Sequence, residues 1–202
     1  KILKKNLNII AKRGDIRNVN FLKKNIIDFK PDIVFHLAAQ AIVSTSYKFP
    51  KKTFETNVLG TLNLLSVLSE LKHKCIAIFI TSDKCYKNIE VSRGYKETDE
   101  LGGDDFYSSS KASAELVFHS FYKSFIKDKN KLLRVATARA GNVVGGGDWS
   151  KNRLIPDCAK SWSKDETVVL RSPNSTRPWQ HVLEALSGYL HLAYQLNNKK
   201  EL

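Results

Sequence analysis

A tyrosine and a lysine four residues apart, Tyr107 and Lys111, are well suited to proton transfer. Side chains at this spacing lie on one face of a helix, so a helix beginning near Tyr107 would bring them together. A nearby ammonium group favours the phenolate and lowers a tyrosine pKa from about 10 towards neutrality. Such a tyrosine could take a proton from a hydroxyl group while a hydride leaves the same carbon. Because this spacing also occurs often by chance, the prediction depends on the surrounding residues.

Small or polar residues follow three apolar runs of the chain. In open parallel sheets, ligands bind beyond the carboxyl ends of the strands. Three such strand ends near one tyrosine therefore predict a site built by several segments together. These segments are Leu37-Ala38-Ala39-Gln40, Thr81-Ser82-Asp83-Lys84 and Gly141-Asn142.

Short apolar runs alternate with longer amphipathic ones, which is typical of βαβ units. This pattern predicts an α/β protein with a Rossmann-like, doubly wound parallel sheet. The long polar segment 86–106 is expected to be a functional loop. We expect strands at 8–11, 32–37, 75–80, 132–138 and 167–170, and helices at 52–71, 110–125, 156–161 and 181–196.

The composition favours a globular, cytoplasmic protein. Hydrophobic residues make up 42% of the 202 residues, and no apolar run is long enough to cross a bilayer. The three cysteines form no C-x-x-C pair, which suits a reducing compartment and predicts no metal site. The sequence contains no methionine, so we expect a piece of a longer chain. The net charge of +13 comes from scattered lysines, which favours attraction of a phosphorylated substrate over nucleic-acid binding.

Taken in chain order, Leu37-Ala38-Ala39, Asn57, Thr81-Ser82-Asp83 and the Tyr107–Lys111 pair resemble the extended short-chain dehydrogenase/reductases. The resemblance implies NAD as cofactor and a sheet that lacks its first strands and the glycine-rich turn. His36 is expected to pack within its strand and not to act as a base. The implied NAD-binding residues are Asp15, Ile16, Leu37, Ala38, Ala39, Gln40, Asn57, Thr81, Tyr107 and Lys111.

Longer strings narrow the resemblance to the CDP-glucose 4,6-dehydratases within that superfamily. They are Thr81–Tyr86, Glu97–Gly103, Ala138–Trp149, Arg153–Asp157 and Arg177–Val182. The implied substrate is CDP-glucose, and the implied reaction is loss of water across C5 and C6 after internal hydride transfer. Tyr107 would be the base, Ser82 would bind the C4 oxygen, and Asp83 would protonate the departing hydroxyl. The implied substrate-binding residues are Ser82, Asn142, Arg153, Leu154, Arg171 and Arg177.

Lys84 is expected in the site, but two residues could remove the C5 proton. Related dTDP-glucose enzymes have a glutamate at this place, which is an obvious base. A lysine can serve only when it is substantially neutral, which requires desolvation or a nearby cation. Tyr107 is the alternative base, so the sequence leaves the catalytic role of Lys84 open.

The resemblance also divides the chain and suggests an assembly. Residues 1–142 would form a partial NAD-binding domain, and residues 143–202 a partial nucleotide-sugar-binding region whose last helix packs back on the core. Relatives pair through their two long helices, which implies a homodimer. Two other functions remain open at this stage. One is an epimerase or reductase of another nucleotide sugar, and the other is a non-catalytic NAD- or nucleic-acid-binding protein.

Overall fold

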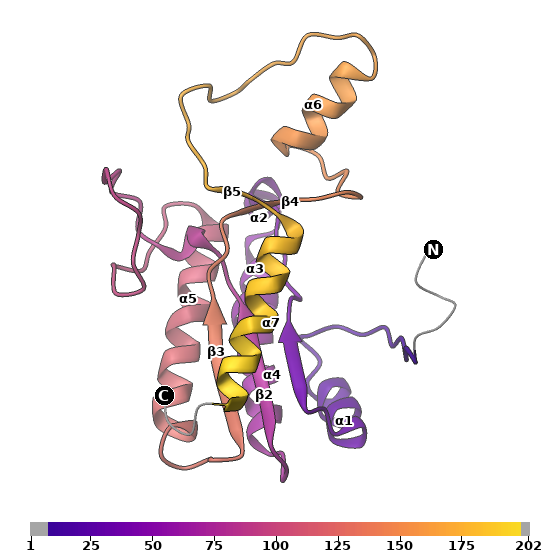
Figure 1. Cartoon of the computed structure of the whole chain (residues 1–202), viewed down its shortest axis with the longest axis vertical. Helices are drawn as coiled ribbons and strands as arrows, with labels where there is room; N and C mark the ends of the chain where they lie inside the picture. The colour runs from indigo at the N-terminus through magenta and orange to yellow at the C-terminus, as the bar shows by residue number, and fades with distance from the viewer. Residues whose placement is uncertain (1–7, 199–202) are drawn as a thin grey trace.

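Three parallel strands form the centre of the fold in this computed structural model, which describes residues 8–198 (Figure 1). Strand β2 lies between β1 and β3, with Ile33 opposite Ile76 and Cys75 opposite Leu133. Five of the six residues of β2 are buried, which explains why its sequence is a continuous apolar run without alternation. The strands are β1 (Ile33–His36), β2 (Cys75–Ile80) and β3 (Leu133–Ala138).

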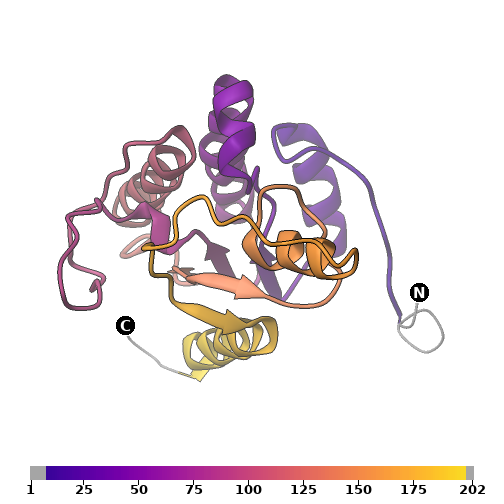
Figure 2. The ribbon, with the colours of Figure 1, turned by 90° about the horizontal axis from the view of Figure 1, so that it is seen from above.

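Helices cover both faces of this sheet, as the view from above shows (Figure 2). A layer that contains α1, α4 and α5 covers one face, and α7 covers the other. Leu65, Leu68 and Phe79 lie in the core of the first face, whereas Ile78 and Leu196 lie in the core beneath α7. The helices are α1 (Val19–Phe29), α2 (Val43–Lys48), α3 (Pro50–Phe54), α4 (Gly60–Ser69), α5 (Phe106–Phe121), α6 (Leu154–Trp162) and α7 (Val182–Asn198).

Two long helical runs confirm the predicted helices, with different bounds. The first run passes from α3 through the π-helical segment η1 (Glu55–Leu59) into α4. The second is α5, followed by the π-helical segment η3 (Tyr122–Ile126). The Asp105 side chain caps α5 by accepting from the Ser108 amide, so Tyr107 stands in the first turn as predicted.

An outer segment, residues 145–178, lies beyond the carboxyl ends of the central strands and contains α6 (Figure 1). A small parallel ladder joins its two ends to the core, formed by β4 (Asn142–Val144) and β5 (Trp179–His181). Gly145 allows a close approach here, because a Cβ would lie 2.6 Å from Val182 Cγ1. The chain runs from β5 directly into α7, whose first residue, Val182, packs against Gly145.

Two predicted strands are wrong. Residues 8–11 and 167–170 are irregular, and neither pairs with another described strand. Val169 is 85% exposed, so the apolar pattern at 167–170 is not matched by burial. The sequence reading also missed α1 and the β4–β5 ladder. Among residues 8–198, no helix has the length and hydropathy of a membrane span.

Candidate active site

Tyr107 and Ser82 meet at the carboxyl end of β2. The chain turns after β2 into the short 3₁₀ helix η2 (Asp83–Cys85), which packs against α5. Ser82 Oγ caps this turn by accepting from the Lys84 amide at 3.2 Å, and it donates to Asp83 Oδ1 at 3.0 Å. Tyr107 is 8% exposed, and the Ser82 side chain lies close enough to its phenol to favour the ionised form. Three of the predicted catalytic residues, Ser82, Asp83 and Tyr107, therefore form one cluster.

The pKa of Tyr107 is raised, which corrects the expectation of a lowered value. Burial is the main cause, because it disfavours the phenolate, and the charge of Asp83 adds to it. The Ser82 side chain and the charge of Arg153 act in the opposite direction. Arg153 of the outer segment is thus near enough to the phenol to favour its ionised form.

Lys111 extends from α5 to the end of β2. Its ammonium donates to the Ile80 carbonyl at 3.3 Å, and the residue is 6% exposed. Burial lowers the pKa of Lys111 to about 8, although the charge of Glu115 favours the ammonium. Lys111 is therefore mostly a cation at neutral pH and loses its charge as the pH rises through about 8.

Asn57 fixes the segment that follows β1. Its Oδ1 accepts from the Gln40 amide at 2.8 Å, and its Nδ2 donates to the Gln40 carbonyl at 3.1 Å and to Ser110 Oγ at 2.9 Å. The Gln40 side chain donates to Thr53 Oγ1 at 2.9 Å. The polar groups of Gln40 are thus used to hold its loop on the helices, while Leu37 and Ala38 stay exposed at the strand end.

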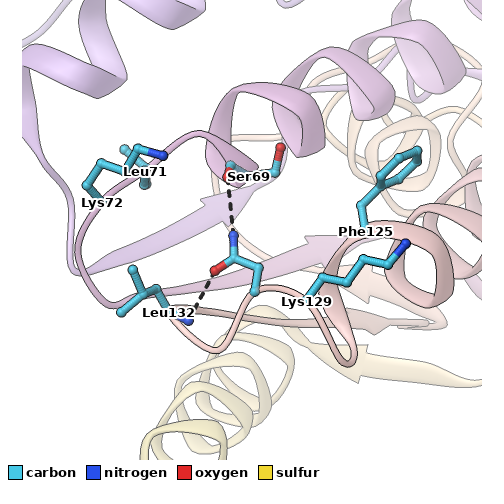
Figure 3. A pocket seen from close by; sticks show the side chains of 7 residues that line it. Ser69, Leu71, Lys72, Phe125, Lys129 and Leu132 are labelled. Carbon is cyan, nitrogen blue, oxygen red and sulfur yellow. Dashed lines mark hydrogen bonds between the residues drawn. The ribbon is translucent and has the colours of Figure 1, made fainter.

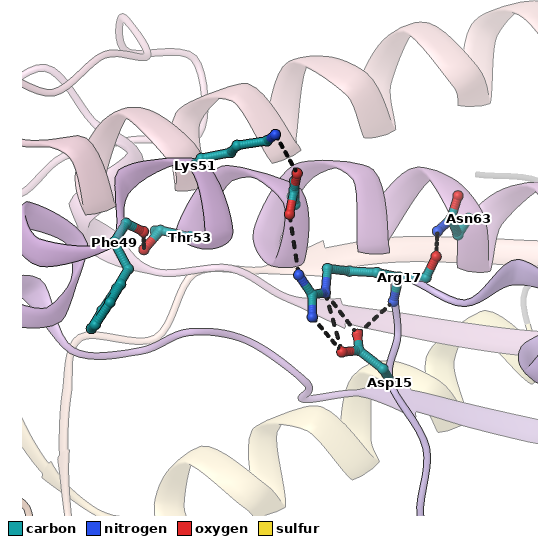
Figure 4. Close-up of polar contacts among 7 residues, drawn as sticks. Asp15, Arg17, Phe49, Lys51, Thr53 and Asn63 are labelled. Carbon is teal, nitrogen blue, oxygen red and sulfur yellow. Dashed lines mark hydrogen bonds and ion pairs between the residues drawn. The ribbon is translucent and has the colours of Figure 1, made fainter.

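Asp15 and Ile16, which were predicted to bind NAD, are held on η1 and α4 by contacts that the sequence did not predict (Figure 4). Asp15 accepts from the Arg17 guanidinium, and Arg17 in turn pairs with Glu55 at 3.1 Å. Hydrogen bonds from Arg17 lower the pKa of Asp15 to about 2. A Cβ added to Gly60 would lie 2.7 Å from Ile16 Cγ2. Glycine at this position of α4 therefore leaves room for the Ile16 side chain. The signal available in the sequence was Arg17 itself, which directly follows Ile16 and carries a charge opposite to that of Asp15.

His36 is a packed residue of β1, as expected. Its ring lies edge-on to Phe79, and its Nε2 is 3.2 Å from Thr61 Oγ1. Burial, together with the charge of Lys111, lowers the pKa of His36 to about 4. The ring is therefore neutral at physiological pH and has no charge to contribute to catalysis.

Thr81 points into a buried polar cluster that the sequence did not reveal. Its hydroxyl donates to Glu115 Oε1. The other carboxylate oxygen, Oε2, accepts from Thr137 Oγ1 at 3.1 Å and from Arg139 Nη2 at 2.8 Å. The Arg139 guanidinium also lies over the Tyr86 ring, 4.9 Å from its centroid. The Thr81 side chain is thus occupied inside the fold, although it was predicted to bind the cofactor.

The predicted phosphate-binding residues occupy the outer segment and its edges. Arg153 reaches the Ala41 carbonyl at 3.5 Å, and Leu154 begins α6 with an exposed side chain. Arg171 donates to the Asn152 side chain and carbonyl at 3.3 and 3.0 Å. Arg177 donates to the adjacent Thr176 carbonyl at 2.6 Å. Arg171 therefore contacts the residue that directly precedes Arg153, whereas within residues 8–198 the Arg177 side chain makes no recorded hydrogen bond to Asn152, Arg153 or Arg171.

Asn142 and Lys84 border the same end of the sheet. Asn142 belongs to β4, where its amide donates to the Pro178 carbonyl at 3.1 Å. The Lys84 side chain is half-buried beside the Ser82 cap. Within residues 8–198, no hydrogen bond is recorded between either of these side chains and Tyr107.

A hollow of about 370 Å³ lies at the opposite end of the sheet from Tyr107 (Figure 3). It is bordered by the end of α4 and the turn into β3, where Asn130 donates to the Ser69 carbonyl and accepts from the Leu132 amide. None of the predicted site residues described above lines this hollow. Within residues 8–198, no group of three or more histidine, cysteine or acidic side chains could hold a metal ion.

The chain resembles known proteins in sequence and in fold. It is 49% identical over 186 residues to a CDP-glucose 4,6-dehydratase of Salmonella typhimurium, covering 91% of this chain and 52% of that protein. It is 30% identical to a UDP-glucose 4-epimerase of Mycoplasma genitalium, covering the whole chain and 62% of that protein. A Streptomyces venezuelae dTDP-glucose 4,6-dehydratase, solved with NAD and TYD bound, superposes with a TM-score of 0.77 at 26% identity, covering 89% and 53%.

The chain spans about half the length of the first of these relatives. The family described as GDP-mannose 4,6 dehydratase matches residues 2–200, which is almost the entire sequence. The Rossmann-like α/β fold agrees with this match. This chain belongs to the GDP-mannose 4,6 dehydratase family, a group of nucleotide-sugar-modifying proteins of the extended short-chain dehydrogenase/reductase type.

Proposed function

We propose that the protein containing this chain is an NAD-dependent dehydratase that converts CDP-glucose into CDP-4-keto-6-deoxyglucose. The observation that carries the proposal is the Asp83 carboxylate, which accepts from Ser82 beside Tyr107. An epimerase needs a base at the sugar hydroxyl but no acid for a leaving hydroxyl. The Asp83 carboxyl adds that second function to the cluster.

The residues at the strand ends fit a dinucleotide. Leu37 and Ala38 offer an exposed apolar surface, Lys111 offers an ammonium donor, and Asp15 offers a carboxylate acceptor. The remaining predicted NAD-binding residues would shape this surface by fixing the backbone around it. They are Ile16, Ala39, Gln40, Asn57 and Thr81. NAD bound there supplies a hydride acceptor for the sugar carbon and later returns the hydride.

Ser82 and Tyr107 would bind the C4 oxygen of the sugar, and Tyr107 would accept the proton of the C4 hydroxyl. Burial raises the Tyr107 pKa, while the Ser82 side chain and the guanidinium of Arg153 favour the phenolate. In the loaded enzyme, the ammonium of Lys111 would have to act in the same direction. A keto group at C4 acidifies the C5 hydrogen. Asp83 would then act as the general acid that gives a proton to the departing C6 hydroxyl. Either Lys84 or Tyr107 would remove the C5 proton.

Phosphate recognition is assigned to Arg153 and Arg171, with Asn142, Leu154 and Arg177 at the edges. A guanidinium fork suits a pyrophosphate, and Arg153 already reaches the Tyr107 site electrostatically. We also propose a cytoplasmic homodimer formed through the run 50–69 and α5. Exposed apolar side chains on both runs, Phe54, Leu59 and Leu116, support that assembly.

The test uses the whole protein with CDP-glucose in deuterated water. A dehydratase loses the C5 hydrogen and must take a new one from solvent, so deuterium at C5 of a 4-keto-6-deoxy product is expected. UDP-glucose serves as the competing substrate. An epimerised UDP sugar without solvent deuterium, and no product from CDP-glucose, would favour the epimerase instead. Salt-sensitive DNA binding without any sugar product would favour the non-catalytic alternative.

A further inference from the structure

Glu115 is a buried carboxylate for which the reaction described above has no use. It is 4% exposed and lies one helical turn after Lys111 on α5, so both side chains are on the same helix face. A charge buried to this extent is costly unless it is paired and hydrogen-bonded. Its partners are Thr81, Thr137 and Arg139, which come from the ends of β2 and β3.

These partners adjoin the groups that the catalytic side chains contact. Thr81 directly follows Ile80, whose carbonyl accepts from Lys111, and directly precedes Ser82, whose side chain lies near the Tyr107 phenol. Glu115 therefore ties α5 to the strand end at the point between these two contacts. A shift of α5 along the sheet would have to break the Glu115 bonds before it separated Tyr107 from Ser82.

Arg139 extends the cluster into the long loop 86–106. Its guanidinium is 2.8 Å from Glu115, donates to the Glu97 carbonyl at 3.2 Å, and lies over Tyr86. Tyr86 stacks on Tyr95 with ring centroids 5.1 Å apart. Arg139 thus contacts the loop at its first residue, Tyr86, and near its middle, at Glu97. The loop begins immediately after the segment that carries Asp83 and Lys84.

The charges around this cluster come from several elements. Lys111 is faced by Glu115 on its own helix, by Cys85 of η2 and by His36 of β1. Glu115 is faced by Arg139 at the end of β3 and by Cys85, whose pKa is raised to about 12 mainly by burial. Cys85 and His36 are neutral at physiological pH. Glu115 is the negative charge that favours the ammonium form of Lys111.

We propose that Glu115, held by Arg139, is a positioning residue that fixes α5, with Lys111 on it, and the loop 86–106 around the catalytic cluster. This inference rests on the proposed function for its kinetic part only. Glu115 acts through Lys111 and the strand ends, and it does not touch the substrate.

The first test is Glu115→Gln in the whole protein. We expect kcat with CDP-glucose to fall by about a hundredfold, with a smaller change in KM, because the displaced groups act in the reaction and not in binding. The alkaline limb of the pH profile should move down by about one unit, because Lys111 loses its neighbouring carboxylate. Glu115→Asp should restore part of that shift. The control is Asp99→Asn, which removes the exposed Arg93–Asp99 pair from the same loop and should leave the profile unchanged.

Two readouts keep the test independent of folding and of the sugar reaction. Glu115→Gln combined with Arg139→Met removes both buried charges, so it should regain stability while the Lys111 pKa stays low. That pKa is followed by NMR of ¹³C-labelled lysine, and hydrogen exchange reports whether amides 86–101 become less protected. An unchanged Lys111 pKa and unchanged exchange in a folded Glu115→Gln protein would overturn the inference. If the wild type produced no deoxysugar, the proposed function would fail, while the NMR and exchange results would still decide the role of Glu115.

Discussion

The sheet end around Tyr107 and the outer segment 145–178 contribute to the same candidate site in different ways. At the sheet end, Tyr107, Lys111 and Glu115 are buried, and each interacts with a side chain or carbonyl from another element. In the outer segment, residues 171–178 are all exposed, and Arg177 donates to its own neighbour. The chemistry is thus placed on buried side chains of the central sheet and α5, whereas the side chains of Arg171 and Arg177 are hydrogen-bonded only within the outer segment among the contacts recorded for residues 8–198.

The two regions touch where residues 152 and 153 meet the loop after β1. Asn152 has a left-handed backbone with φ of 64°, and its side chain donates to Ser44 Oγ at 3.4 Å. Arg153 reaches the Ala41 carbonyl beside it. A turn of this kind is well suited to asparagine, which adopts positive φ more readily than most residues. This contact explains how an otherwise exposed segment influences the Tyr107 pKa.

The largest effect should come from the phenol itself. Tyr107→Phe removes the proposed base while keeping the buried ring, so we expect kcat to fall by about 10²- to 10⁴-fold with unchanged folding. The measurement is steady-state turnover of CDP-glucose, with circular dichroism for the fold. Tyr122→Phe, at a half-buried tyrosine of η3, is the matched control and should stay close to wild type. A Tyr107→Phe protein with wild-type turnover would remove Tyr107 from the mechanism.

The next largest effect is expected on the free energy of unfolding, when an apolar side chain is truncated in the sheet core or in the outer segment. Leu65 is fully buried between the sheet and the helical layer, so Leu65→Ala should lower the free energy of unfolding by about 2–5 kcal/mol. Val169→Ala removes an apolar side chain that is 85% exposed, and we expect a change within about 0.5 kcal/mol. Urea unfolding measures both. Comparable losses in the two variants would show that the outer segment is packed against something in the whole protein.

The contrast between these regions also explains how far the sequence could be interpreted. The run from Cys75 to Ile80 was predicted with its observed bounds because a buried parallel strand is apolar at every position. The residues from Thr167 to Leu170 have a similar pattern, yet they have no strand partner within residues 8–198. The local sequence pattern indicates that a segment tends to adopt an extended conformation, whereas its pairing into a sheet depends on a segment far away in the chain. The β4–β5 ladder was missed for the same reason, since its three-residue strands are joined across a long outer segment.

The candidate site shows a similar division. Ser82, Asp83 and Tyr107 were predicted together because the strings that carry them resemble one family, and they lie together at the carboxyl end of β2. The Glu115–Arg139 pair joins the interior of α5 to the end of β3, 24 residues further along the chain, and no family string or motif in the sequence pairs those two charges. The raised Tyr107 pKa likewise depends on burial, which the motif does not encode.

A smaller effect is expected from the buried imidazole. His36 has a pKa of about 4 in the fold, whereas a free histidine titrates near 6.5. Below pH 6.5 the unfolded chain takes up a proton that the folded protein excludes, so stability falls as the pH drops from about 6.5 to 4. We expect a loss of about 2 kcal/mol between pH 7.5 and pH 5. Urea unfolding at both values measures it, and His36→Gln should remove most of the difference. An equal loss in that variant would assign the pH dependence to other groups.

The smallest effect distinguishes two arginines within the outer segment. Arg171 donates twice to Asn152, beside Arg153, whereas Arg177 is bound only to the adjacent Thr176 among the contacts that the structure records. Arg171→Ala should therefore raise the KM for CDP-glucose by about tenfold, the loss of one charge-assisted hydrogen bond, with kcat nearly unchanged. Arg177→Ala should raise KM less. Initial rates over a range of substrate concentrations measure both, and Arg171→Lys tests whether the planar fork is needed in addition to the charge. A larger KM effect at Arg177 would mean that the outer segment closes over the nucleotide in a different arrangement, and that the Asn152 contact is not the one that orients it.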